Sequence, residues 1–239
     1  MITHYATPDM MSTLLVIVGA VFVHACYQLS LSVLTLLSSH SIARRLPNTR
    51  LLNLSFWYII GAVIALTALQ LAALAFMRAL AEHSFLAASA LTMATLPLIA
   101  ILTALIYYRR GAGTRLWLPR SAASYITNRA KKTRSSVEAL GLGIVTVVTE
   151  LPFAIAPVAI VAYVLYRLPA EQWLQLSAAY GVLVAAPLVF TALYISSGHK
   201  VSRVQLWREG AKPFLQWTSA FMLFALAIFI AILQLEAEL

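Results

Sequence analysis

Charged residues and cysteines are both scarce in this sequence. Only 10% of the 239 residues are Asp, Glu, Lys or Arg, whereas soluble domains carry roughly 25%. A water-soluble fold of this length could not hide so much apolar surface, so lipid must surround most of the chain. The single cysteine, Cys26, excludes an intramolecular disulfide and any all-cysteine metal site within the chain.

Motifs of known catalytic or nucleotide-binding sites are also missing. The sequence contains no G-x-S-x-G, H-E-x-x-H, G-x-x-x-x-G-K-[ST] or G-x-G-x-x-G pattern. His4, His40, His83 and His199 are too scattered for a metal cluster. We therefore expect no enzymatic activity, no cofactor and no metal, and transport would draw on an ion gradient or on the solute's own gradient.

Long apolar runs dominate what is present. The chain is 62% hydrophobic, with a mean hydropathy of +0.86. A helix needs about 20 apolar residues to cross a bilayer. Six runs satisfy this requirement, at about 13–37, 54–78, 85–108, 140–166, 174–196 and 214–235. We predict an all-α integral membrane protein with six transmembrane helices, the first of which is too long to be a cleavable signal peptide.

The positive charges predict the orientation of these helices. Of the 17 Lys and Arg residues, only Arg78 and Arg167 fall outside the segments that follow the first, third and fifth runs. Basic segments stay cytoplasmic, so we expect both termini to face outward. The net charge of +9 is then a signal of topology and of contact with anionic lipid headgroups, and nucleic acid is not expected as a partner.

The chain divides into two halves within one transmembrane domain. Residues 1–108 form the first three-helix half, 109–137 a basic cytoplasmic loop, and 138–239 the second three-helix half. Three crossings are an odd number, so the second half enters from the opposite face, as in the inverted repeats of secondary transporters. The residue identities of the two halves match poorly. The loop sequence "RLWLPRSAASYITNRAKK" fits either an interfacial segment or a solvated linker.

One acid stands near the middle of the fourth run, in "VVTELPFAIAP". An ionised carboxylate at the bilayer centre costs several kcal/mol, so Glu150 has to be protonated, paired or in contact with water. A functional role explains the presence of Glu150 better than a structural accident does. We predict that Glu150 binds a proton, a cation or a substrate.

Two prolines follow this acid in the same helix. Pro152 and Pro157 each lack the N–H that would bond the carbonyl four residues earlier, so two backbone oxygens are freed near Glu150. Thr146 and Thr149 add hydroxyls on or near the same face. Such an oxygen-rich spot suits a proton, a cation or the donor groups of a substrate. The alternative is that the prolines only kink the helix for packing.

The first run carries a second polar cluster. His24 and Gln28 lie four residues apart on one helical face, and Ser32 and Thr35 continue the stripe. Histidine changes charge near neutral pH, so a pair formed by His24 and Glu150 would neutralise both groups at mid-depth. The alternative is that these side chains only join the first helix to its neighbours through hydrogen bonds.

The run "TELPFAIAP", which begins the second set of three helices after a basic loop, resembles the LysE superfamily of bacterial membrane exporters. The nearest likeness is to the GAP or sulfolipid-addressing type and to CcdA-like relatives. Those proteins carry an acid-x-Pro-x-x-x-x-Pro-like run, matched here by Glu150, Pro152 and Pro157. CcdA-type proteins pass electrons through two membrane cysteines, and a chain with Cys26 alone departs from that chemistry.

The resemblance implies a three-plus-three fold and an exporter in the bacterial cytoplasmic membrane. We therefore expect a secondary transporter for a small solute, an ion or a lipid-linked product, with Glu150 as its mid-membrane site. The alternative is a non-transporting subunit or scaffold of a lipid- or envelope-assembly complex. The expected partners are the lipid bilayer and the transported solute or ion, and a homodimer or a membrane partner subunit is left open.

Overall fold

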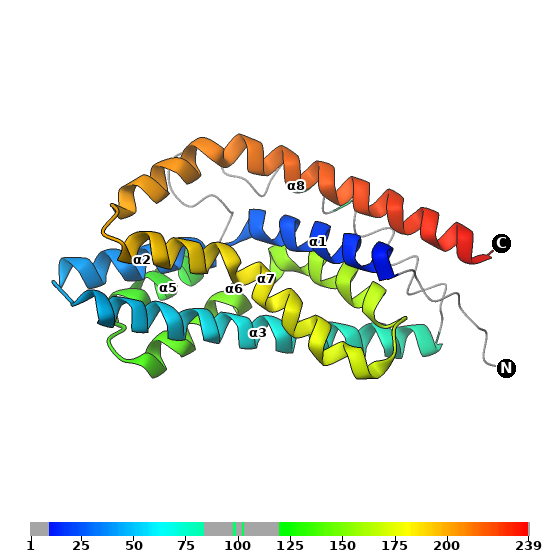
Figure 1. Cartoon of the computed structure of the whole chain (residues 1–239), viewed down its shortest axis with the longest axis horizontal. Helices are drawn as coiled ribbons and strands as arrows, with labels where there is room; N and C mark the ends of the chain where they lie inside the picture. The colour runs from blue at the N-terminus through cyan, green and yellow to red at the C-terminus, as the bar shows by residue number, and fades with distance from the viewer. Residues whose placement is uncertain (1–9, 84–97, 99–101, 103–119, 239) are drawn as a thin grey trace.

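The computed structural model describes residues 10–83, 98, 102 and 120–238 of the chain. All regular structure in these residues is helical, and Figure 1 shows the helices side by side in an elongated bundle. The elements are α1 (Met10–Tyr27), α2 (Ser30–Ala43), α3 (Asn48–His83), α5 (Arg120–Lys132), α6 (Ser136–Leu165), the 3₁₀ turn η2 (Ala170–Gln172), α7 (Trp173–Ser196) and α8 (Val201–Glu238).

Several of these helices are long and apolar enough to cross a membrane. Among the described residues they are α3, α6, α7 and α8, and the pair α1–α2, bent by 48°, adds a fifth if it counts as one span. The predicted all-helical fold is therefore confirmed for the described residues, together with several helices long and apolar enough to span a membrane. The predicted third span, 85–108, lies outside the described residues except at two positions. Six spans with both termini outside thus stay a prediction.

Two predicted boundaries were wrong. The first span is not one helix over 13–37, because the chain breaks at Gln28 and Leu29. The last helix does not begin near residue 214 but at Val201, so Arg203 and Arg208 lie on α8 and not in a loop. Arg, Lys, Gln and Leu are good helix formers, which explains why the helix continues through this basic stretch.

The basic central segment contains a short helix, α5, which packs against the bundle. Its Ile126 and Ala130 are buried, and the helix contacts α2 and α6. The Arg44 side chain at the end of α2 donates to the backbone carbonyls of Lys131 and Thr133. The described part of this segment is therefore a docked amphipathic helix and not a solvated linker.

The centre of the bundle is the close contact between α3 and α6. A Cβ atom added at Gly61 would lie 2.1 Å from the carbonyl oxygen of Leu140, and one added at Gly143 would lie 2.1 Å from that of Tyr58. The two backbones touch because neither glycine has a side chain, as is common between membrane helices. This contact fixes α6, and with it Glu150, against α3.

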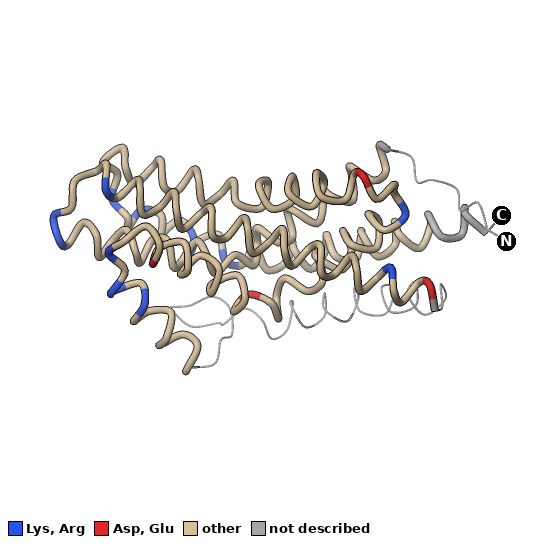
Figure 2. Tube along the Cα trace, turned by 90° about the horizontal axis from the view of Figure 1, so that it is seen from below, with Lys and Arg blue, Asp and Glu red and all other residues tan. Residues whose placement is uncertain are grey.

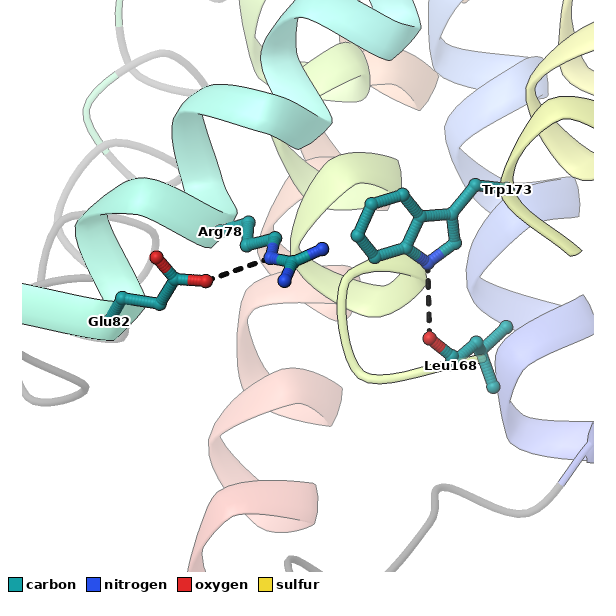
Figure 3. A network of polar contacts seen from close by, with 4 residues as sticks. All are labelled: Arg78, Glu82, Leu168 and Trp173. Carbon is teal, nitrogen blue, oxygen red and sulfur yellow. Dashed lines mark hydrogen bonds and ion pairs between the residues drawn. The ribbon is translucent and has the colours of Figure 1, made fainter. Parts of the chain in front are cut away.

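The two ends of the bundle differ in charge. Most of the described Lys and Arg residues gather at one end (Figure 2), whereas α1 begins and α8 ends at the other (Figure 1). Figure 3 shows how Arg78 is held at this second end. Its Nε donates to Glu82 at 2.8 Å, and its guanidinium lies 5.4 Å from the ring centroid of Trp173. The Trp173 indole donates to the Leu168 carbonyl at 3.0 Å, so these contacts join α3 to the loop between α6 and α7.

We expect Gly143→Ala to destabilise the protein by about 1–3 kcal/mol, because the added methyl group pushes α6 away from α3. Gly141→Ala on the same helix is the matched control, since a Cβ atom there meets nothing within 4 Å. Reversible unfolding in mixed micelles of a mild and a denaturing detergent gives the comparison. Equal stability of the two variants would contradict the close contact between α3 and α6.

Candidate functional site

The break between α1 and α2 is the central feature of the candidate site. A helix that stops leaves carbonyls at its end, and a helix that starts leaves N–H groups at its beginning, all without partners inside the helix. In hydrocarbon each unsatisfied group costs several kcal/mol. Neither proline nor glycine occurs in the broken stretch, Gln28 to Ser32. Some of its backbone groups bond locally, such as the Ser32 N–H to the Leu29 carbonyl at 2.8 Å, and side chains from other helices bind others.

Glu150 on α6 holds the beginning of α2. Its Oε1 accepts hydrogen bonds from the backbone N–H of Ser30 and from the Ser30 hydroxyl, the latter at 2.7 Å. The Glu150 side chain is buried, with only 2% of its surface exposed. The positive end of the α2 helix dipole faces this carboxylate, which is where an anion is stabilised.

Arg208 on α8 holds the end of α1. Its Nη2 donates to the carbonyl oxygen of Gln28 at 3.0 Å, and its Nη1 donates to the Ser32 hydroxyl at 2.6 Å. A cation at this position faces the negative end of the α1 dipole. The break is thus held by opposite charges, an acid from α6 at one helix end and an arginine from α8 at the other.

Every polar group of Ser30 has a hydrogen-bond partner on a neighbouring helix. Its N–H and hydroxyl bind Glu150, and its carbonyl oxygen accepts a hydrogen bond from the Tyr58 hydroxyl of α3 at 3.0 Å. Tyr58 and Ser30 are both buried. The first residue of α2 is therefore fixed from two neighbouring helices.

The predicted polar cluster of α1 faces α7 and not Glu150. His24 Nδ1 lies 2.6 Å from the Tyr180 hydroxyl, and Gln28 Nε2 donates to the Val184 carbonyl at 2.5 Å. The suggested pair of His24 with Glu150 is therefore absent from the described contacts. Each of these two side chains keeps one buried polar atom without a hydrogen-bond partner among the described residues, His24 Nε2 and Gln28 Oε1. Buried polar atoms normally have partners, so these two mark a place for water or a polar ligand.

The part of the α6 threonines and prolines in a site around Glu150 stays a prediction. Thr146 donates to the Leu142 carbonyl and Thr149 to the Thr146 carbonyl, both at 2.7 Å, so their hydroxyl protons stay within the helix. Pro157 is buried and Pro152 is exposed, although both lie inside a continuous α6. Glu150 lies between the two threonines and the two prolines on the same helix.

A cavity of about 770 Å³ lies beside the break, among α1, α2, α7 and α8. Arg208 lines it, as do Cys26 and Pro187, whereas Glu150 is not among its lining residues. The cavity also touches the broken helix directly through Cys26 and Leu31, and Arg208 is the charged residue that both lines it and contacts the break.

Sequence reasoning missed Ser30, Tyr180 and Arg208 as parts of this site. Arg208 was counted only as a topology charge, although it directly follows Leu206 and Trp207, two large apolar side chains that suit a helix in lipid. Ser30 lay between two candidates of the polar stripe, Gln28 and Ser32, and was not considered. Tyr180 carries a hydroxyl within an apolar run, and nothing in the sequence indicated that this hydroxyl contacts His24.

Within the described part of the chain, no group of three or more His, Cys, Asp and Glu side chains could hold a metal ion. Comparisons with protein-family models, with curated proteins and with solved structures found no match. The likeness to the LysE superfamily therefore stays a prediction that depends on the residues around Glu150.

We expect the contact between Ser30 and Glu150 to appear as an energetic coupling. In a double-mutant cycle of Ser30→Ala and Glu150→Ala, the loss of unfolding free energy in the double variant should be about 1–2 kcal/mol smaller than the sum of the two single losses. Either single change already removes the hydrogen bond between the Ser30 hydroxyl and the carboxylate, so this bond is lost only once. Detergent unfolding provides the four stabilities.

The matched control pairs Ser30→Ala with Thr149→Val, because the Thr149 hydroxyl bonds only its own helix. Those two changes should add. A cycle of Ser30 with Glu150 that is equally additive would rule out the proposed cap on α2.

Proposed function

We propose that this protein is a secondary membrane transporter, in which the break between α1 and α2 is the element that moves. The observation that carries the proposal is the pair of opposite charges, Glu150 and Arg208, placed at the two ends of a broken apolar helix. Discontinuous helices of this kind form the substrate and ion sites of many transporters. The wider assignment, an exporter of a small solute, an ion or a lipid-linked product, follows the resemblance to the LysE superfamily.

In this proposal Glu150 is the proton site. As a carboxylate it accepts two hydrogen bonds from Ser30, and charge-assisted bonds of this kind are stronger than neutral ones. Protonation removes the charge, weakens both bonds and loosens the start of α2 from α6. Movement of α2 then exchanges an occluded arrangement, in which Glu150 is 2% exposed, for an open one.

The polar atoms that lack partners supply the matching solute contacts. His24 lies in the last turn of α1, and Gln28 is the first residue of the break. The atoms without partners are His24 Nε2 and Gln28 Oε1. They offer a ring nitrogen and an amide oxygen to a small polar solute. The solute site and the proton site would then lie on the two sides of the same break, which couples them mechanically.

A second candidate function is a non-transporting membrane subunit. The observation that favours it is the complete set of contacts around Ser30, whose N–H, hydroxyl and carbonyl all have partners. In that case Glu150 and Arg208 only stabilise a bent helix, and the bend shapes a docking surface for a partner.

We expect Glu150→Gln to abolish proton-coupled transport while the protein stays folded. Glutamine keeps an oxygen that can accept from Ser30, but it cannot bind or release a proton. Vesicles that contain the purified protein and a trapped pH-sensitive dye are exposed in turn to lysine, arginine, glutamate, Na⁺, K⁺ and phosphate. At least one of them should move protons through the unmodified protein, and Glu150→Gln should slow this movement by about tenfold or more.

Glu171→Gln is the matched control, because Glu171 is an exposed acid in η2, far along the chain from the break. Its proton movement should stay within about twofold of the unmodified protein. Transport that survives Glu150→Gln would contradict the proton role. Absence of any movement with all six solutes would favour the non-transporting subunit.

A further inference from the structure

We propose that the cavity between α7 and α8 binds an anionic phospholipid, whose phosphate contacts Arg203 and whose acyl chain lies along the apolar wall. This inference goes beyond the proposed transport and holds whether or not the protein moves a solute. It assigns a ligand to the cavity that lies beside the break, among α1, α2, α7 and α8.

The lining of the cavity combines positive charge with apolar surface. Arg203 and Arg208 line it, and no acidic side chain does. The rest of the wall is largely apolar, including Phe22, Phe190 and Leu215. Guanidinium groups match the geometry of a phosphate, because two parallel N–H donors can bind two phosphate oxygens. The chemistry that fits is therefore an anion attached to a hydrocarbon chain.

The two arginines have different surroundings. Arg208 is partly buried and binds the break through Gln28 and Ser32. Arg203 is exposed, and its side chain has no hydrogen bond or ion pair to the residues that the structure describes. Because Arg203 needs no partner inside the protein, it is the group that a phosphate can bind without breaking an existing contact.

The position of the cavity favours a lipid over a soluble anion. Arg203 lies two residues after the start of α8, and the apolar run of α8 follows it along the helix. α8 begins at the end of the bundle opposite to the C-terminus (Figure 1), where most of the described Lys and Arg residues gather (Figure 2). Basic pockets between membrane helices at the basic side bind anionic lipid headgroups. Trp207 of the lining and Phe214 nearby are each 65% exposed, so the surface beside the cavity is apolar. A soluble phosphate would leave that wall uncovered.

The volume agrees with this occupant. Pockets for small ligands measure about 300–1,000 Å³, and the cavity of about 770 Å³ falls in this range. It can hold a headgroup with part of one chain, while the remainder of the lipid stays in the bilayer.

Brominated lipids quench tryptophan fluorescence on contact, and Trp207 in the wall provides the probe. The protein is reconstituted into phosphatidylcholine vesicles that contain a small fraction of either brominated phosphatidylglycerol or brominated phosphatidylcholine. Subtraction of the same measurement on Trp207→Phe isolates the Trp207 signal. We expect brominated phosphatidylglycerol to quench this signal at a several-fold lower mole fraction than brominated phosphatidylcholine.

Arg203→Gln should reduce this preference by about fivefold, which corresponds to the loss of one basic contact to an anionic lipid. Arg129→Gln is the matched control, since Arg129 is an exposed base on α5 that does not line the cavity. It should leave the preference unchanged. Thermal unfolding in detergent verifies that both variants fold.

Equal quenching by the two brominated lipids, or an unchanged preference in Arg203→Gln, would overturn the proposal. A third arm adds millimolar glycerol phosphate to the vesicles. Loss of the preference in that arm would show that the site takes a soluble phosphate and not a lipid. The measurement needs no gradient and no flux, so its failure and a failure of the proposed transport are distinguishable.

Discussion

The satisfaction of backbone groups at a helix break is the constraint on which the rest of this structure depends. Between Tyr27 and Ser30 an apolar helix ends and another begins, and hydrocarbon offers no partner to the groups left over. Glu150 and Arg208 supply these partners from α6 and α8. Each charge alone would be costly in lipid, and each helix end alone would be unsatisfied. Brought together, the acid faces the positive end of one dipole and the arginine faces the negative end of the other.

The packing of the helices differs across the bundle. The backbones of α3 and α6 touch at Gly61 and Gly143, so the acid is carried by a closely packed pair of helices. Among the described elements, α8 makes its main contacts with α1 and α2, and a cavity separates part of it from α7. The arginine is therefore carried by the more peripheral helix. A movement of α8 would act on the break through Arg208 while Glu150 stayed in place.

Much of the fold was predictable because the length and hydropathy of a segment suffice to identify a membrane helix. Glu150 was predictable for the same reason, since an acid in the middle of such a segment is costly unless it has a partner. The break was not predictable, because no proline or glycine marks residues 28 to 32. The side chains that contact it, Glu150 and Arg208, lie 120 and 176 positions along the chain from their partners Ser30 and Ser32. Arg208 was misinterpreted because a basic residue near a membrane normally reports orientation. The role of His24 depended on Tyr180, which an apolar run conceals.

The length of α8 has a consequence for the membrane around it. At about 1.5 Å per residue, its 38 residues extend about 57 Å, nearly twice the hydrocarbon thickness of roughly 30 Å. Its apolar run, 214–235, covers only about 33 Å, close to that thickness, so the excess length lies mainly in the basic turns that precede Pro213. These turns extend toward the headgroup layer. A change in bilayer thickness would therefore displace the turns that carry Arg208, and with them the break that Arg208 contacts.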